Sequence, residues 1–233
     1  MSAMKLLLSA ALAAAVAMPA AGAAAPARNS SAVDWSTRVA ATPEGGFRMG
    51  NPAAAVKVVE YGSLTCPHCA DFAKAAKGPL TARVRTGKVS FEYRTYVLNG
   101  IDAAATLVAR CAAPANFFRI ADSFFATQPQ WVGKVSGLSP AQKAEIGKLP
   151  EGQRLVRLAE IGGMLGVAAQ AGVPAARAKA CLADPAGLQK IGEVGQAAVD
   201  LCVQGTPTFF INGRNVGVQD WPGLEALIRQ AGG

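Results

Sequence analysis

Two stretches decide the fold of this chain: Cys66-Pro67-His68-Cys69 and, far later in the sequence, Gly205-Thr206-Pro207-Thr208-Phe209. A CxxC pair at the start of a helix is typical of a redox or a metal site. The second stretch places a Thr-Pro step directly before an apolar strand. A cis peptide bond at that step would leave the Thr206 backbone free to pair with an extended substrate. Together the two stretches favour thiol–disulfide exchange.

The first 23 residues have the pattern of a secretory signal peptide. Lys5 supplies a positive start, Leu6 to Met18 form an apolar run of 13 residues, and small residues surround Ala23. The alternative, a transmembrane anchor, requires roughly 20 apolar residues. We therefore expect cleavage after Ala23, or after Ala25 or Ala27, and a soluble protein exported to the periplasm.

The number of cysteines does not indicate a fold that is held together mainly by disulfides. The five cysteines are Cys66, Cys69, Cys111, Cys181 and Cys202. Export places them in a compartment where disulfides persist. Five cysteines are nevertheless too few to replace a hydrophobic core in a chain of this length.

The chain is basic, with a formal net charge of +8. Such a charge admits a nucleic-acid partner, but export argues against that class. The basic residues are also scattered, and no cluster is denser than Arg83-Val84-Arg85. A solvated surface is the better interpretation, so we expect no nucleic-acid partner.

The strand and helix patterns predict two α/β halves separated by helices. We expect a loose lead-in over residues 24–46 and a first half over 47–100. This half holds a strand at 55–61, a helix from Cys66 that is interrupted or kinked at Gly78-Pro79, and a strand at 89–96. Because such crossovers are right-handed, the two strands should be parallel.

Residues 101–190 carry apolar stripes at helical spacing and predict an inserted all-helical domain. Pro174 and Pro185 stand where new helices would begin. The second half, residues 191–233, has strands at 208–211 and 214–218 joined by the Asn212-Gly213 turn, and a last helix from Asp220. The prediction is one α/β fold with a helical insertion.

The chemistry of disulfide exchange requires one exposed thiol that is ionised at neutral pH. Cys66 lies where the unpaired N–H groups of a helix N-terminus stabilise an anion, and Pro67 fits the first turn. We expect a lowered pKa for Cys66, with His68 contributing charge or hydrogen bonds to the thiolate. Glu60 ends a buried strand and is a candidate proton acceptor for the Cys69 thiol.

Each of these assignments has a structural alternative. CxxC alone could bind zinc, but zinc needs four ligands, and the chain has a single histidine and no second CxxC. We therefore expect no metal. A plain structural disulfide across CxxC is equally disfavoured. Pro207 could be an ordinary strand-edge proline. Glu60 could instead reach solvent or pair with Arg94.

In these residues the chain resembles the DsbA-like periplasmic thiol–disulfide oxidases of the thioredoxin superfamily. The resemblance runs from about Arg48 to Ala231 and rests on residues 59–69, the helical insertion and residues 205–213. It implies a thioredoxin fold with an inserted all-helical domain and no cofactor. Thr206 differs from the Val usual in the best-known enterobacterial oxidases, which puts substrate or partner preference in question.

The resemblance also implies roles for individual residues. Cys66 forms the mixed disulfide with reduced exported proteins, Cys69 resolves it, and Glu60 matches the buried acid of the family. A DsbB-like, quinone-linked membrane partner re-oxidises the pair. Similar proteins bridge two cysteines of the helical insertion, which implies a structural Cys111–Cys181 disulfide. Cys202 is then expected to be a buried free thiol.

Three functions compete on this basis. The leading one is a monomeric oxidase that donates its Cys66–Cys69 disulfide. The second is a periplasmic disulfide isomerase or reductase, although isomerases of this compartment generally carry a dimerisation domain, for which the residues before the fold are too few. The third is a copper-handling thioredoxin-like chaperone, because soft thiolates suit Cu(I).

Overall fold

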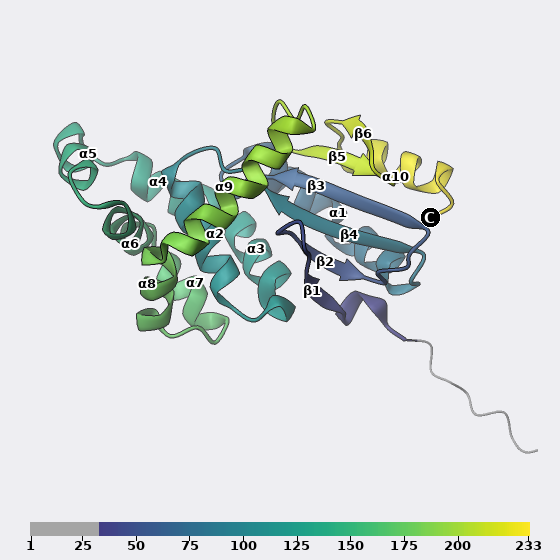
Figure 1. Cartoon of the computed structure of the whole chain (residues 1–233), viewed down its shortest axis with the longest axis horizontal. Coiled ribbons are helices and arrows are strands. Elements are labelled where there is room, and N and C mark those ends of the chain that lie inside the picture. The colour runs from purple at the N-terminus through teal and green to yellow at the C-terminus, as the bar shows by residue number, and fades with distance from the viewer. Residues whose placement is uncertain (1–32) are drawn as a thin grey trace, which may run out of the picture. The chain divides into compact units, whose positions relative to one another are not determined.

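The computed structural model describes residues 33–233 and is built on a six-stranded mixed sheet in the order β1-β2-β4-β3-β5-β6 (Figure 1). The expected signal peptide, residues 1–23, lies outside the described residues, as does the first part of the expected lead-in. The strands are β1 (Val39–Ala41), β2 (Phe47–Gly50), β3 (Val56–Gly62), β4 (Val89–Thr95), β5 (Thr208–Ile211) and β6 (Arg214–Gly217).

The centre of the sheet is the predicted strand–helix–strand unit. β3 and β4 are parallel and are joined by α1 (Pro67–Arg85), as the right-handed crossover requires. The other neighbouring pairs are antiparallel. Because β3 and β4 lie in the middle of the sheet, both are buried over most of their length. The CxxC motif therefore follows a strand that is fixed on both sides.

Residues 33–46 differ from the loose lead-in that the sequence predicts. They contain a short 3-10 helix, η1 (Trp35–Thr37), and β1, which pairs antiparallel with β2 at the edge of the sheet. The strand is only three residues long, and two of them are alanine, so it has no readable alternation of apolar and polar side chains. Its pairing with β2 depends on tertiary structure.

Helix α1 continues past the expected break at Gly78-Pro79. Proline removes one backbone hydrogen bond, to the carbonyl four residues earlier. Here Pro79 and Ala75 are both exposed, so water can satisfy the freed carbonyl of Ala75. The buried face of the helix, which includes Phe72, holds it against the sheet.

The expected all-helical insertion is present. Its members are α2 (Gly100–Cys111), the 3-10 turn η2 (Pro114–Asn116), α3 (Phe117–Ala126), α4 (Gln128–Ser136), α5 (Pro140–Gly147), α6 (Glu151–Gly162), α7 (Met164–Gln170), α8 (Ala175–Ala183) and α9 (Pro185–Asp200). Pro174 and Pro185 begin helices as predicted. The expected boundary at residue 190 falls within α9, so one continuous helix joins the insertion to the second half. No helix within residues 33–233 is long and apolar enough to cross a membrane.

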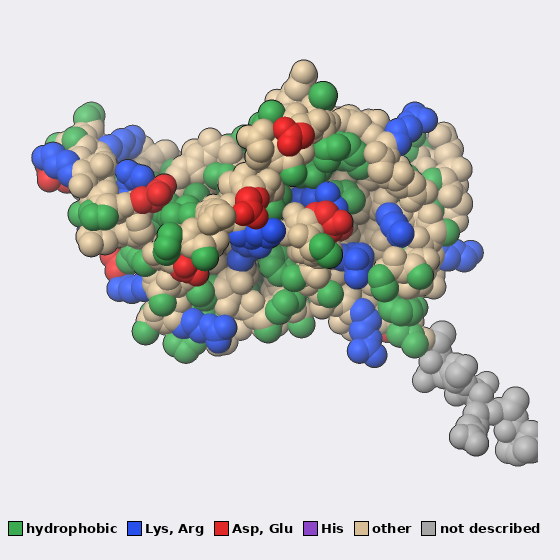
Figure 2. Space-filling view, viewed as in Figure 1, with side chains coloured by type: hydrophobic (Ala, Val, Ile, Leu, Met, Phe, Trp, Pro, Cys, Tyr) green, Lys and Arg blue, Asp and Glu red, His purple; other side chains and the backbone are tan. Residues whose placement is uncertain are grey.

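Helices cover both faces of the sheet (Figure 1). On one face Phe72 of α1 packs against Phe209 of β5, with ring centroids 4.5 Å apart, and against Trp221 of α10 (Trp221–Gln230). On the other face α9 packs on the apolar cluster that includes Tyr61 and Phe210. On the side of the molecule seen in Figure 2, Lys and Arg side chains are dispersed, with Asp and Glu among them.

Candidate active site

Cys66 is the N-cap residue of α1, and Cys69 lies inside the first turn of that helix. Pro67 occupies the first helical position, where its missing N–H costs nothing. The Cys66 residue is 6% exposed and Cys69 is fully buried, so only the first thiol reaches the surface, and by less than the sequence predicts. Both cysteines are free thiols in this structure, which therefore represents the reduced form.

The environment of Cys66 favours its thiolate. Its pKa falls from 9.0 to about 5, mainly because the Cys69 thiol donates a hydrogen bond to it, and further because the Thr206 side chain and the backbone N–H groups of His68 and Cys69 donate as well. Burial opposes this shift. The two backbone N–H groups are the unpaired groups of a helix N-terminus that the sequence predicts, but the largest contribution comes from the Cys69 side chain. In its protonated form the Cys66 thiol donates to the Thr206 carbonyl oxygen, with 3.2 Å between Sγ and that oxygen.

Cys69 behaves in the opposite way. Its pKa is raised strongly, first because its proton is engaged in the hydrogen bond to Cys66, then because of burial and the nearby Glu60 carboxylate. At neutral pH the pair therefore holds one thiolate and one thiol. This asymmetry favours the predicted roles, in which Cys66 is attacked and Cys69 resolves the mixed disulfide.

The Thr206-Pro207 peptide bond is cis, as the sequence predicts, and its loop lies against Cys66 although 140 residues separate them along the chain. Pro207 is buried and Thr206 is half-buried. The predicted meeting of the two decisive stretches is thus confirmed.

Glu60 is buried, with 3% of its surface exposed, and its Oε1 atom has no hydrogen-bond partner within the described part of the chain. Its pKa rises from 4.5 to about 8, mainly through burial and also through the nearby Cys66 thiolate. A carboxyl group with this pKa can hold or release a proton near neutral pH. Glu60 therefore does not reach solvent as an ordinary strand-end carboxylate would, and its role in proton transfer stays a prediction.

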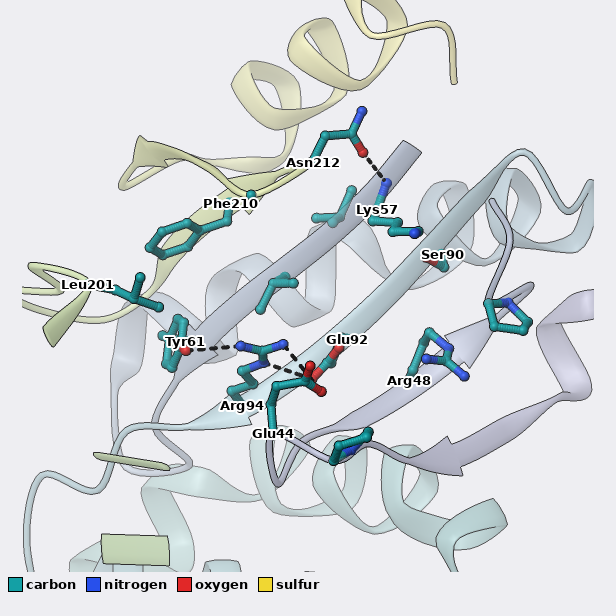
Figure 3. A pocket seen from close by; sticks show the side chains of 15 residues that line it. Glu44, Arg48, Lys57, Tyr61, Ser90, Glu92, Arg94, Leu201, Phe210 and Asn212 are labelled. Carbon is teal, nitrogen blue, oxygen red and sulfur yellow. Dashed lines mark hydrogen bonds and ion pairs between the residues drawn. The ribbon is translucent and has the colours of Figure 1, made fainter. Parts of the chain in front are cut away.

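The alternative partner of Glu60, Arg94, points to the opposite face of the sheet. There Arg94 lies 2.7 Å from Glu92 and 3.8 Å from Glu44, and it donates to the Tyr61 hydroxyl (Figure 3). Successive side chains of a strand point to opposite faces. Glu60 and Arg94 accordingly lie on different sides of the sheet and cannot form an ion pair.

His68 contributes through its backbone. Its side chain is exposed, and its imidazole makes no hydrogen bond among residues 33–233. The N–H group of His68 nevertheless donates to the Cys66 thiolate. The predicted side-chain hydrogen bond to Cys66 is therefore absent in this part of the chain, and the imidazole is left facing solvent beside Pro207.

Two residues of the helical insertion, neither of which the sequence predicts to act at the site, hold the segment before Cys66. The Gln128 amide of α4 donates to the carbonyl oxygens of Leu64 and Cys66, at 2.8 and 2.9 Å. The Asp102 carboxylate of α2 accepts from the N–H groups of Leu64 and Leu98, both at 3.0 Å. Both side chains are buried. Burial raises the pKa of Asp102 to about 6. No local sequence signal marks either residue, because all these contacts except the one to Leu98 are distant in sequence.

The remaining cysteines divide as the resemblance implies, with one correction. Cys111 and Cys181 form a disulfide that joins α2 to α8. Cys202 is free, but it is exposed, and the expectation of a buried thiol is wrong. Cys202 has a φ of 58° at the end of α9, and Val203 closes the helix by donating to the Ala198 carbonyl. This left-handed ending buries Val203 and turns Cys202 outward.

Comparison with known proteins places this geometry in a family. A family model described as thioredoxin matches residues 42–230. A protein named protein-disulfide isomerase from Novosphingobium aromaticivorans has a similar crystal structure, with 30% identity, a TM-score of 0.74, and coverage of 79% of this chain and 96% of that one. The α-DsbA1 structure of Wolbachia pipientis shares the fold at 20% identity and a TM-score of 0.63, covering 79% of this chain and 89% of that one.

Curated relatives give the same picture. Two Rickettsia proteins, from R. bellii and R. felis, are named protein-disulfide oxidoreductases and are 28% and 29% identical over 71% and 78% of this chain. The chain spans little more than half of their length, 56% and 59%. Because the family model matches most of the chain, the chain belongs to the thioredoxin family.

Proposed function

We propose that this protein is a periplasmic oxidase that donates its Cys66–Cys69 disulfide to reduced exported proteins. The observation that carries the proposal is the asymmetry of the two thiols, with the pKa of Cys66 at about 5 and that of Cys69 raised. A stabilised Cys66 thiolate stabilises the reduced form. A dithiol whose reduced form is stabilised is a strong oxidant when it carries the disulfide.

The reaction proceeds in two exchanges. A substrate thiolate attacks Cys66 Sγ, the Cys66–Cys69 bond breaks, and the Cys69 sulfur leaves and takes up a proton. The second substrate thiolate then attacks the substrate sulfur of the mixed disulfide and releases the Cys66 thiolate. The substrate loses two electrons and two protons, and the enzyme gains the two electrons and one proton at Cys69. The other proton goes to solvent.

Substrate binding is proposed at the groove next to the cis-proline loop. This groove, about 520 Å³, passes His68 and Pro207 and is lined on its other side by Val218, Trp221 and Pro222. Val218 is 66% exposed, so the groove offers apolar surface to an unfolded chain. The half-buried Thr206 backbone offers strand-like pairing beside it.

Export and re-oxidation complete the proposal. The signal-peptide pattern of residues 1–23 supports a periplasmic location, which fractionation of expressing cells tests directly. The DsbA-like resemblance supports re-oxidation by a quinone-linked membrane protein. Within residues 33–233 no group of three or more His, Cys, Asp or Glu side chains is arranged to hold a metal ion. The oxidase proposal uses the thiols alone.

The test is oxidative folding of reduced, denatured ribonuclease A by a stoichiometric amount of the oxidised protein without oxygen. We expect rapid loss of ribonuclease thiols, unaffected by Cys202→Ser and abolished by Cys66→Ser. A scrambled-ribonuclease assay run beside it separates the alternative. If the reduced protein unscrambles ribonuclease efficiently while the oxidised protein transfers its disulfide slowly, the protein is an isomerase, as its Novosphingobium relative is named.

A further inference from the structure

Two buried oxygen atoms near Cys69 have no hydrogen-bond partner among the described residues, and they lie together. They are Glu60 Oε1 on β3 and the Tyr93 hydroxyl on β4. Both residues are 3% exposed, and they are paired in the parallel register of the two strands. Residues in register on neighbouring strands point to the same face of a sheet. This face is the one that α1 covers.

Gly62 shows how close the two oxygens are. A Cβ atom built on Gly62 would lie 2.7 Å from Glu60 Oε1 and 2.9 Å from the Tyr93 hydroxyl. Two oxygens that are both within 3 Å of one point are close enough for a single water molecule to hydrogen bond to both. Buried polar groups are rarely left without a partner, protein or water. The two oxygens are therefore placed so that one water molecule would satisfy both.

A cavity of about 110 Å³ connects this pair with the surface. It lies between α1, β4 and α3, and Glu60 and Tyr93 line its inner part. Lys77 of α1 and Asp122 of α3 line its outer part and form an ion pair with a separation of 2.9 Å. The volume exceeds the about 10–15 Å³ that one water molecule needs. This opening lies on the side of α1 away from the groove lined by Pro207 and Trp221.

We propose that Tyr93 is a positioning residue of a proton relay, in which its hydroxyl and a bound water connect the Glu60 carboxyl with solvent through the cavity between α1 and α3. This inference rests on the proposed function and assigns its proton path. When the Cys66–Cys69 bond breaks, Glu60 gives its proton to the Cys69 sulfur. The carboxylate then takes a proton from the water held by Tyr93, and solvent replaces that proton through the cavity.

The charges around this path are few. The titratable and charged groups that face Glu60 and Tyr93 are Cys66 and Cys69 at the start of α1, Lys77 further along α1, Asp122 on α3 and Asp102 on α2. β5 contributes the apolar Phe209. Burial keeps the pKa of Tyr93 well above its ordinary value, so its hydroxyl stays protonated and acts as a donor and acceptor.

The experiment measures the rate at which dithiothreitol opens the oxidised disulfide, by stopped-flow fluorescence from pH 5 to 9, in H₂O and D₂O. The test variant is Tyr93→Phe, which keeps the ring packed against Phe117 and Phe125. The matched control is Tyr61→Phe, which removes a buried hydroxyl from the opposite face of the same sheet. A second variant, Ala73→Leu, fills the cavity from a half-buried position of α1.

We expect Tyr93→Phe and Ala73→Leu to slow the opening roughly tenfold, a part of what general acid catalysis contributes, and to change the solvent isotope effect. In both test variants the equilibrium reduction potential and the Cys66 pKa should equal those of the wild type. The control variant Tyr61→Phe should open at the wild-type rate. Rate profiles for both test variants that superimpose on the wild type would overturn the relay. Because dithiothreitol replaces the protein substrate, this outcome is independent of the ribonuclease assay that tests the proposed function.

Discussion

At the scale of single residues, function depends on two thiols three positions apart that have opposite proton affinities. Cys66 receives the hydrogen bonds of a helix N-terminus, whereas Cys69 is buried and gives one. The sequence identifies the CxxC motif, but the difference between the two cysteine pKa values depends on where the folded chain places the two thiols. Both residues are buried, but the N-cap position of Cys66 leaves it 6% exposed, whereas Cys69 inside the first turn of α1 is fully buried.

The Cys66 pKa predicts a pH dependence for the reduced protein. Because this pKa is 9.0 in the unfolded reference and about 5 in the folded protein, the stabilisation is complete above pH 9, declines as the pH falls and is lost below about pH 5. Urea unfolding of the reduced and oxidised forms between pH 4 and 9 measures it. Cys66→Ser should remove this component, and a reduced form equally stable at pH 4.5 and 8, relative to the oxidised form, would contradict the assignment.

Glu60 predicts the opposite dependence. Its pKa of about 8 exceeds the reference value of 4.5, so the folded protein binds this proton more tightly and loses stability as the pH rises from 4.5 to 8. Glu60→Gln should stabilise the protein by an amount that grows across this window, on the order of a few kcal/mol at its upper end. Glu44→Gln, at an exposed carboxylate, is the control. An equal gain at pH 4 and pH 8 would show that Glu60 does not titrate there.

At the scale of elements, the contact between α4 and the start of α1 joins the insertion to the reacting thiols. Gln128→Ala would leave the buried carbonyl oxygen of Leu64 without its donor, which costs about 1–3 kcal/mol, whereas the Cys66 carbonyl oxygen would keep the N–H group of Ala70. We also expect a raised Cys66 pKa, because the segment before the helix loosens. Absorbance of the thiolate at 240 nm follows this pKa.

The exposed neighbour Gln130 provides the matched control for that prediction. Gln130→Ala should leave both the unfolding free energy and the Cys66 titration unchanged. The role of α4 would be refuted by a Gln128→Ala variant that is destabilised but titrates at the wild-type pH, because the amide would then serve stability alone.

The elements that the sequence predicts well have strong local patterns. β3 and β5 carry buried apolar runs, β4 alternates as a strand does, and Pro174, Pro185 and Asp220 mark helix starts that the structure confirms. Three features depend on distant contacts instead. β1 exists through its pairing with β2, α1 passes Pro79 because that face is exposed, and Cys202 is turned outward by the way α9 ends. None of these has a local signal.

At the scale of the whole molecule, the Cys111–Cys181 disulfide closes a loop between residues 70 positions apart within the helical insertion. A double Cys111→Ser and Cys181→Ser variant should lose about 2–5 kcal/mol of stability. The Cys66–Cys69 exchange with dithiothreitol should persist wherever the variant remains folded. Cys202→Ser is the control, since an exposed free thiol contributes little. An undiminished unfolding free energy in the double variant would show that the disulfide does not stabilise the insertion.

The sequence predicts one feature of the whole-molecule arrangement, because two distant motifs together indicate that the segments carrying them lie side by side. The CxxC motif and the Thr206-Pro207 step indicated that the two halves meet, and the structure places them 3.2 Å apart, from Cys66 Sγ to the Thr206 carbonyl. The role of Gln128 was not predictable in this way. A glutamine in a helix has many uses, and only the packed insertion shows that it contacts Cys66.

The measurement that tests the central claim most directly is the equilibrium reduction potential of Cys66–Cys69 against glutathione, with Cys202→Ser to exclude the third thiol. The stabilised Cys66 thiolate predicts a strongly oxidising couple, near the roughly −120 mV of a strong disulfide donor. A value near the roughly −270 mV of thioredoxin would contradict the account, because the pair would then be a poor donor of disulfides.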